Sequence, residues 1–428
     1  LMASSRSRCS TFNSSSLRRN ASCSSMVLRG ENGRQIRGDG CFRLLVFHDS
    51  RMVIDPIDAT QSESKRADTM KRLGLLTSGG DCAGLNAAIR AVVKRAVTGY
   101  GAEVVGILQG TRGLMERPVK ARPLDLAVFT GDILRQGGTM LGTVNKGNPF
   151  TFPDGKGGVS DRSAEVLDGI RQLDLDALIG IGGDGSMRIL KRLADQGNLP
   201  FVGIPKTIDN DVPGTEMCIG YHTAVATAVE ALDRLQPTAA SHQRVMVLEV
   251  MGRDAGHIAL AAGIAGGADV ILIPEIPYDP AAVTAKLASV AQEGRNHALV
   301  ICAEAAKPIG GHIETRPDPG GKAHYGGAGQ VVGAEIARAT GADVRVTVLG
   351  HVQRGGMPTS IDRLLASAFG VHAVDLAAAG KTGRMVGWRG GDTIDTALRD
   401  LADGPRCVDL EGSQARTARG LGICLGDR

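Results

Sequence analysis

Short apolar segments alternate with longer amphipathic segments along the chain, beginning directly after Met70. The short segments are rich in Val, Ile and Leu and are apolar throughout rather than at alternate positions, which predicts parallel strands covered by helices on both faces. The expected strands are 73–76, 103–108, 177–181, 201–205, 244–250, 268–273, 298–303 and 343–349. The expected helices are 83–97, 186–194, 222–235 and one that begins near Gly256. The pattern therefore predicts the α/β class.

Four polar clusters lie at the ends of these strands, and open parallel sheets bind ligands at the carboxyl ends of their strands. The first cluster, TSGGDCAGLN at 77–86, has two glycines that let the backbone approach an anion, followed by a helix with free N–H groups. Alternatively the turn is simply tight, so this cluster alone leaves phosphate binding open. Since the clusters follow strands, we expect them to line one cleft or two facing clefts.

The second cluster, GIGGDG at 180–185, has the glycine spacing of a dinucleotide-binding turn but contains a carboxylate. Asp184 would repel a pyrophosphate group, so a metal ion is the natural mediator between Asp184 and phosphate. A dinucleotide-binding turn is also followed by a lone acid about 20 residues later, whereas this chain continues with PKTIDND at 205–211. The context therefore favours a metal–phosphate site.

The third cluster, PKTIDND, combines two carboxylates, an amide, a hydroxyl and an ammonium group directly after a strand. An aspartate beside a sugar hydroxyl can accept its proton during phosphoryl transfer, although a polar turn with local hydrogen bonds is the other interpretation. The fourth cluster is a set of arginines at strand ends, Arg244, Arg253, Arg345 and Arg354, with His351 nearby. Arginine suits bidentate phosphate recognition and stabilisation of charge in a transition state.

Composition narrows the classes of function. A chain of 428 residues is long enough for two domains or one large α/β unit. The net charge of +4 and the aromatic content of 3% disfavour single-stranded nucleic acid as a partner. No stretch approaches the roughly 20 apolar residues of a membrane span. The cysteines form no C-x-x-C pair, which favours a reducing compartment over zinc or a disulfide framework, and P-loop and protein-kinase signatures are absent.

Residues 1–69 differ from the rest of the chain, since they are rich in Ser and Arg and contain no acidic residue before Glu31. We expect this extension to be disordered and to take no part in catalysis. It resembles an organellar transit peptide, which would place the protein in a plastid. The interpretation that we favour is upstream sequence included by a wrong start, with Met70 as the true start and a cytoplasmic protein.

The runs LTSGGD, GGDGS, PKTIDND, SHQRVMVLEVMGRDAGHIAL and TVLGHVQRGG together resemble the phosphofructokinases of glycolysis, in the same order, over roughly 71–387. The likeness is greater to cyanobacterial-type than to enteric-type members. It implies two Rossmann-like, three-layer α/β/α domains with the active site in the cleft between them. The implied limits are 71–210 for the part of domain 1 that binds the phosphoryl donor, 211–345 for the sugar-phosphate domain, and 346–428 for a return to domain 1 and a tail.

The resemblance also implies the reaction. ATP, with Mg²⁺, would give a phosphoryl group to the 1-hydroxyl of fructose 6-phosphate, so that fructose 1,6-bisphosphate and ADP form. The protein would be a homotetramer or homodimer without nucleic-acid or membrane partners. Asp209 would be the base, Thr207 and Asp211 would orient the reacting groups, and Arg253 would stabilise the transferring phosphoryl group.

Binding residues follow from the same resemblance. Asp184 would hold magnesium, and the residues implied at the donor phosphates are Gly80, Asn145, Lys146, Gly183, Asp184, Gly185, Ser186 and Lys206. Those implied at fructose 6-phosphate are Thr207, Asp209, Met251, Gly252, Arg253, Glu304, His351 and Arg354, joined from a neighbouring subunit by Arg244 and Arg345. Lys146 stands after GGTMLGT where many relatives have an arginine, and it can replace that arginine only as a point charge.

The two positions that distinguish phosphoryl donors disagree. Gly185 resembles ATP-dependent members, because a second aspartate there would obstruct the nucleotide's α-phosphate and marks pyrophosphate-dependent members. Lys206 resembles the pyrophosphate-dependent members, since many ATP-dependent ones have glycine there. We favour ATP, with a pyrophosphate-dependent enzyme as the alternative and ADP as a minor one.

Two other classes of function remain as hypotheses. A dinucleotide-dependent oxidoreductase is suggested by the glycine spacing alone. A non-catalytic subunit that senses sugar phosphates would be expected to lack Asp184 or Asp209, and both acids are present.

Overall fold

The structure is a computed structural model that describes residues 28–29, 35–36, 70–145, 147–155, 157–317 and 323–427. The chain divides into two units, residues 1–65 and 66–428. In the first unit, β1 (Leu28–Arg29) and β2 (Gln35–Ile36) pair as an antiparallel ribbon. Otherwise the interpretations of residues 1–69 lie outside the described residues.

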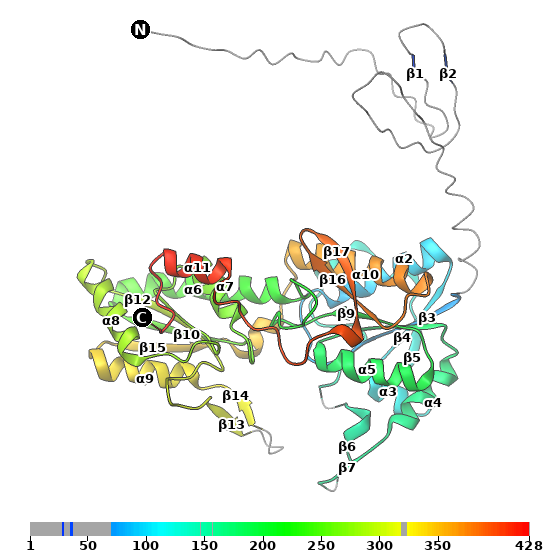
Figure 1. The fold of residues 1–428 in the computed structure, drawn as a ribbon, viewed down its shortest axis with the longest axis horizontal. Coiled ribbons are helices and arrows are strands. Elements are labelled where there is room, and N and C mark those ends of the chain that lie inside the picture. The colour runs from blue at the N-terminus through cyan, green and yellow to red at the C-terminus, as the bar shows by residue number, and fades with distance from the viewer. Residues whose placement is uncertain are drawn as a thin grey trace. The chain divides into compact units, whose positions relative to one another are not determined.

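The larger sheet of the second unit has the strand order β17-β16-β9-β8-β3-β4-β5 (Figure 1). Its strands are β3 (Arg72–Thr77), β4 (Glu103–Ile107), β5 (Ala121–Pro123), β8 (Ala177–Gly182), β9 (Phe201–Pro205), β16 (Arg384–Arg389) and β17 (Asp392–Ala397). Strands β16, β9, β8, β3 and β4 pair in parallel, and β5 and β17 pair antiparallel at the two edges.

Helices cover both faces of this sheet because alternate side chains of a strand point to opposite faces. Leu73 and Leu75 of β3 belong to a core with α2 (Leu85–Tyr100) and α10 (Ser360–Ala378). Leu76, the next apolar residue, belongs to a second core with α3 (Thr111–Met115), α4 (Ser163–Leu173) and α5 (Asp184–Gly197). These layers form the first lobe.

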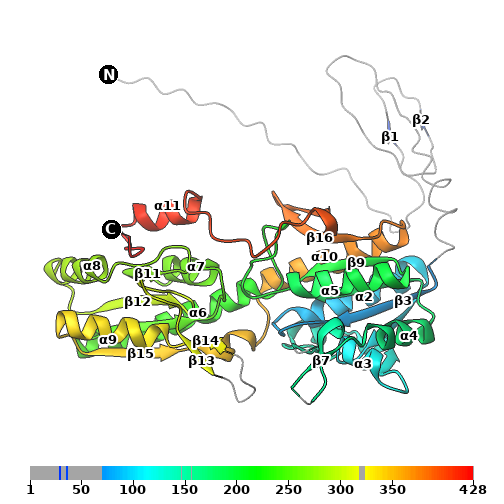
Figure 2. The same cartoon turned by 60° about the horizontal axis from the view of Figure 1, so that its bottom comes forward.

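The second lobe is built on a parallel sheet of order β11-β12-β10-β15. Its strands are β10 (Val245–Val250), β11 (Val270–Leu272), β12 (Ala298–Ala303) and β15 (Val344–Val348). One face packs in the first core with α6 (Tyr221–His242) and α7 (His257–Ala265), and the other packs with α8 (Pro280–Gln292) and α9 (Ala328–Thr340). Figure 2 shows these helices around the strands of the small sheet. The predicted α/β class with two three-layer halves is confirmed.

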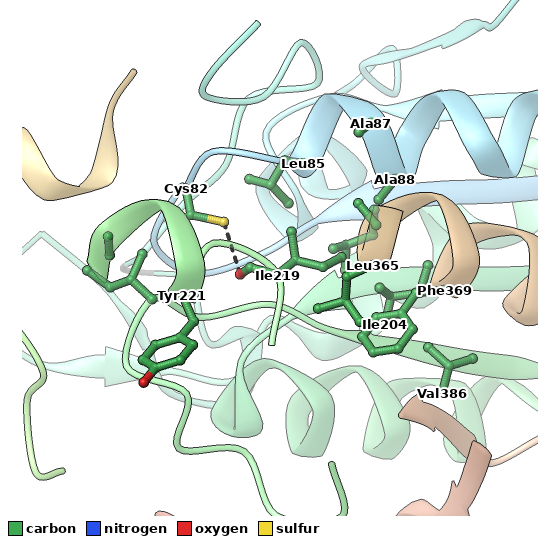
Figure 3. Close-up of a cluster of buried hydrophobic side chains, with 14 of the residues drawn as sticks. Cys82, Leu85, Ala87, Ala88, Ile204, Ile219, Tyr221, Leu365, Phe369 and Val386 are labelled. Carbon is green, nitrogen blue, oxygen red and sulfur yellow. Dashed lines mark hydrogen bonds between the residues drawn. The ribbon is translucent and has the colours of Figure 1, made fainter. Parts of the chain in front are cut away.

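One apolar core continues from the first lobe into the second. It includes Leu85 and Phe369 beside the large sheet and Leu248 in the small one. Figure 3 shows part of this core, where the Cys82 thiol donates to the carbonyl oxygen of Ile219 at 3.3 Å. This hydrogen bond connects the glycine turn after β3 to the residues just before α6. The segments that follow β3 and β9 therefore pack against the same apolar core.

The remaining elements are short. They are the hairpins β6 (Phe152–Pro153) with β7 (Val159–Ser160) and β13 (Thr315–Pro317) with β14 (Ala323–Tyr325), the 3-10 turns η1 (Leu126–Val128), η2 (Gly131–Arg135), η3 (Pro149–Thr151), η4 (Gly350–Arg354) and η5 (Leu398–Asp400), and α11 (Ser413–Gly420). Among the residues that the structure describes, no helix is both long and apolar enough to cross a membrane.

The chain crosses between the lobes more than once. It leaves the large sheet after β9, builds the small sheet, returns as β16 and β17, and then crosses again, so that Cys424 forms an isolated parallel bridge with Val270 of β11. All eight predicted strands are present; six have shifted ends, and 201–205 and 298–303 match their strands end to end. The predicted domain limits stay predictions.

Candidate active site

Two cations flank the backbone of Gly80, just after β3. Lys206, only 3% exposed, donates from Nζ to the Gly80 carbonyl oxygen. Arg354 donates from Nη1 to the Asp81 carbonyl oxygen at 3.2 Å, and a Cβ atom on Gly80 would lie 2.7 Å from the same Nη1. A side chain at Gly80 would therefore displace the guanidinium. The turn and its two cations form a cradle suited to an anion.

The loop that follows 137–142 lies against the same turn. Gly79 donates its N–H to the Val144 carbonyl oxygen at 3.2 Å, and the Thr143 hydroxyl donates to the Gly79 carbonyl oxygen at 2.6 Å. Asn145 is exposed in this loop, while Lys146 lies outside the described residues. A Cβ atom on Gly79 would be 3.2 Å from the Ser186 hydroxyl. Three stretches predicted at the donor phosphates are thus brought together.

Asp184 is the first residue of α5, with Gly183 as its N-cap. The free N–H groups and partial positive charge at a helix start favour a bound anion or a carboxylate. Gly185 is exposed, and a Cβ atom there would meet nothing within 4 Å. The start of α5 is therefore open to a ligand on the side of Gly185.

Asp209 lies in the loop after β9 and is only 7% exposed. Its N–H donates to the Thr207 hydroxyl at 3.1 Å, and that hydroxyl is 3.2 Å from Oδ2 of Asp209. The other carboxylate oxygen, Oδ1, is buried and has no partner within the described part of the chain. Burial raises the pKa of Asp209, and the positive charges of Arg354, Arg253 and Lys206 oppose this shift. An unpartnered buried oxygen is costly, so this carboxylate is poised to accept a proton.

Asp211 lies close enough to Asp184 and Asp209 for both negative charges to affect its pKa. Burial first, and then Asp209 and Asp184, raise the pKa of Asp211 to about 6. The strands that carry these acids end side by side, because Gly182 of β8 is in register with Pro205 of β9. Three acids therefore share one end of the large sheet.

The second lobe contributes a strained turn at the end of β10. Gly252 has φ 154° and Arg253 has φ 53°, a conformation that non-glycine residues rarely adopt. Oε1 of Glu304 accepts from the N–H of Gly252 at 3.4 Å and of Arg253 at 3.0 Å. The N–H of Met251 donates to the buried Gln353 at 2.7 Å. These bonds hold the exposed Arg253 side chain at the carboxyl end of the small sheet.

Glu304 and Asp209 interact across the two lobes. Burial raises the pKa of Glu304 to about 7, and the negative charge of Asp209 adds to the shift. Conversely, Arg253 lowers the pKa of Asp209. The charged residues of the two lobes therefore act on one another's pKa values. This agrees with the expectation that the polar clusters at the strand ends face one another.

The four predicted arginines do not form one cluster within a single chain, and Arg244 and Arg345 are the two that the family resemblance assigns to the site of a neighbouring subunit. Arg244 precedes β10, and Arg345 lies near the start of β15, in register with Met246. Both donate to Asp343, from Nε of Arg244 at 2.6 Å and from Nη1 of Arg345. Their position is the amino end of the small sheet, opposite the end that carries Arg253. Within one chain, only Arg253 and Arg354 reach the site.

Several functional candidates escaped the sequence analysis because they are buried polar residues. Asp362, fully buried in α10, accepts from the N–H of Gly220 at 2.9 Å and of Thr223 at 2.7 Å, and from the Thr223 hydroxyl at 2.5 Å. Gln353 also donates to the Ala224 carbonyl oxygen at 3.3 Å. Both therefore hold the first turn of α6. An acid in the first turn of a largely apolar helix is the sequence signal for Asp362, whereas His351, which was predicted, is exposed in η4.

The donor set for a metal is small. No group of three or more His, Cys, Asp or Glu side chains that could hold a metal ion occurs in the described ranges. Magnesium, however, keeps several waters and is commonly bound by one or two carboxylates together with substrate phosphates. Asp184 beside the cationic turn fits a metal of that kind, held together with phosphate oxygens.

Comparisons with known proteins agree with this geometry. The family model described as Phosphofructokinase matches residues 72–377. ATP-dependent 6-phosphofructokinase 1 of Synechocystis sp. is 57% identical over 361 residues, covering 84% of this chain and 99% of the relative. The protein of the same name from Nostoc sp. is 55% identical over 357 residues, covering 83% and 99%. This chain belongs to the phosphofructokinase family.

Solved structures give the same result for the fold. Phosphofructokinase from Saccharomyces cerevisiae superposes with a TM-score of 0.66 at 30% identity, covering 77% of this chain and 45% of the yeast chain. A pyrophosphate-dependent phosphofructokinase from Marinobacter aquaeolei has a TM-score of 0.67 at 21% identity over 84% and 93%, which is a likeness of fold. The expected family is confirmed, and so is the likeness to cyanobacterial members.

Proposed function

We propose that this protein transfers the terminal phosphoryl group of ATP to the 1-hydroxyl of fructose 6-phosphate, releasing fructose 1,6-bisphosphate and ADP. The observation that carries the proposal is Asp209, a buried carboxylate with one oxygen that has no partner among the described residues, beside a cationic glycine turn. The names of the relatives, which are 55% and 57% identical, support ATP as the phosphoryl donor.

The chain's own residues divide the work of the reaction. Oδ1 of Asp209 takes the proton of the sugar's 1-hydroxyl while the hydroxyl oxygen attacks the terminal phosphorus of ATP and ADP leaves. Arg253 and Arg354 stabilise charge on the transferring phosphoryl group and on the sugar phosphate. The turn at Gly80, the start of α5 and Lys206 hold the donor phosphates. Magnesium bound with ATP would be held by Asp184 and would neutralise phosphate charge.

A coupled assay tests this proposal. Purified protein is given fructose 6-phosphate and Mg²⁺ with ATP, ADP or pyrophosphate, and fructose 1,6-bisphosphate is measured. We expect product with ATP. Product with pyrophosphate and none with ATP would support the pyrophosphate-dependent alternative, to which Lys206 points.

Gly185→Asp is expected to raise KM for ATP about tenfold or more, because two negative charges a few ångströms apart repel by several kcal/mol in a partly buried site. The open space at Gly185 lets the side chain fit, so the temperature of unfolding should stay unchanged. Initial rates over a range of ATP concentrations measure the effect. Gly420→Asp is the matched control, since a Cβ atom there also meets nothing within 4 Å. An unchanged KM for ATP in Gly185→Asp would show that the α-phosphate of ATP does not bind next to residue 185.

We also infer that the protein acts as a homo-oligomer in which Arg244 and Arg345 reach the sugar-phosphate site of a neighbouring subunit. This is supported by their position at the amino end of the small sheet, away from Arg253. Exposed apolar side chains on α10 offer a surface for a second copy, with Ile361 46%, Leu364 72% and Val371 39% exposed. Sedimentation of the active enzyme tests the inference, and a fully active monomer would contradict it.

A further inference from the structure

The segment 405–408 crosses from the first lobe to the second, after η5 and before α11 (Figure 1). Arg406 binds the loop that carries Asp209 at three points. Its backbone N–H donates to the Asp211 carbonyl oxygen at 2.6 Å, and its Nη2 donates to the carbonyl oxygens of Asn210 at 2.5 Å and Glu216 at 3.2 Å. One arginine therefore joins both ends of the segment 210–216.

The same segment is anchored on the second lobe. The Arg406 carbonyl oxygen lies 2.8 Å from Nε2 of His257, the first residue of α7. A carbonyl oxygen can only accept, so His257 carries its proton on Nε2. Next along the chain, Val408 donates its N–H to Oε1 of Glu275 at 2.8 Å, and that oxygen also accepts from the N–H of Gly256 at 3.0 Å. Arg406 is therefore held between the two lobes.

The loop needs such support because its backbone is strained. Asn210, between Asp209 and Asp211, has φ 55°, and a non-glycine residue keeps such a conformation only where its surroundings enforce it. Its own side chain helps, since Oδ1 accepts from the N–H of Cys218 at 2.9 Å and Nδ2 donates to the Glu216 carbonyl oxygen at 3.1 Å. Nη2 of Arg406 donates to the Asn210 carbonyl oxygen, so Arg406 fixes the peptide that follows this turn.

We propose that Arg406 is a positioning residue, which holds the turn bearing Asp209 and joins the placement of that turn to the second lobe. The proposal rests on the proposed function, since the role of Asp209 as the base belongs to that reaction. A guanidinium suits the task because its planar N–H groups can reach two carbonyl oxygens at once, which an ammonium on a flexible chain does less well.

The test compares Arg406→Gln and Arg406→Lys with the wild type, using the coupled assay and thermal unfolding. Arg399→Gln is the matched control, because Arg399 lies a few residues earlier and its side chain is 81% exposed. We expect kcat of Arg406→Gln to fall about 10- to 100-fold, since a displacement of about 1 Å at a reacting group costs as much. KM of Arg406→Gln for fructose 6-phosphate should stay near the wild-type value. The kcat of Arg406→Lys should lie between those of the wild type and Arg406→Gln.

Each outcome decides the matter. A kcat of Arg406→Gln equal to that of the control, or a lower kcat with an equal loss of sugar-phosphate binding, would overturn the positioning role. Should Arg406→Gln fail to fold, Arg406→Lys alone decides, because it keeps the charge but lacks the planar guanidinium that fixes the direction of the two N–H groups of Nη2. A wild-type protein that is inactive with every phosphoryl donor would refute the proposed function, whereas an active wild type with unchanged variants would refute only the role of Arg406.

Discussion

Replacing Asp209 with serine is expected to lower kcat by about 10²- to 10⁴-fold, which is the usual contribution of a positioned general base. KM for fructose 6-phosphate should change little, because serine removes the proton acceptor and leaves Arg253, Arg354 and Glu304 in place. Steady-state rates with ATP and fructose 6-phosphate measure both constants. A variant with near-normal kcat would exclude Asp209 as the base.

The stability of the same variant gives an independent check. Asp209 is buried and its Oδ1 has no partner within the described residues, so its charged form costs stability in the native state. We therefore expect Asp209→Ser to unfold at the same temperature as the wild type or higher. Asp132→Ser, at a side chain that is 88% exposed, is the control and should leave both rate and stability unchanged. A marked fall in unfolding temperature would mean that the lost activity reports misfolding.

The second large effect is expected at Asp362, on stability. Asp362→Ala removes the acceptor of two backbone N–H groups and one hydroxyl in a fully buried place. Each buried donor left unsatisfied costs about 1–3 kcal/mol, so we expect the free energy of unfolding to fall by about 3–5 kcal/mol, at the upper end for single substitutions. Urea unfolding followed by circular dichroism measures the change.

Asp233→Ala is the control for Asp362→Ala, because Asp233 lies exposed on the same helix α6 that Asp362 supports. Asp362→Asn should be intermediate, since its amide oxygen can still accept one of these bonds. If Asp362→Ala were as stable as Asp233→Ala, the three hydrogen bonds would contribute nothing to the folded state.

Eight strands of the two sheets could be predicted from the sequence, and most of these have side chains that enter apolar cores on both faces. Leu75 and Leu76 are neighbours in the chain yet belong to different cores, and this produces an unbroken apolar run. The antiparallel pair β16 and β17 escaped prediction because β17, the sequence DTIDTA, is a half-exposed edge strand with little apolar character. Strand β5 is too short for any periodicity.

Prediction of the site identified short motifs in which chemically active residues are concentrated, and the roles of those residues stay predictions. PKTIDND and GGDGS indicate which residues meet, because the strands before them are neighbours in the sheet. It did not show at which end of the small sheet Arg244 and Arg345 lie, since the start and the end of an apolar run look alike in a sequence, and their place at a neighbouring subunit's site stays a prediction. It also failed for Gln353 and Asp362, whose partners Met251 and Gly220 lie 102 and 142 positions away. Such contacts arise only once the chain has folded.

The late return of the chain to the large sheet affects how the protein folds during translation. Strand β9 receives its outer neighbour β16 only after the whole small sheet has been made, and β11 gains the bridge to Cys424 later still. During translation, at about 5–20 residues per second, the edge of β9 stays without its partner while about 180 further residues emerge, from Pro205 to Arg384. The nascent protein therefore depends on late-made segments to close both lobes, and aggregation is the hazard during that interval.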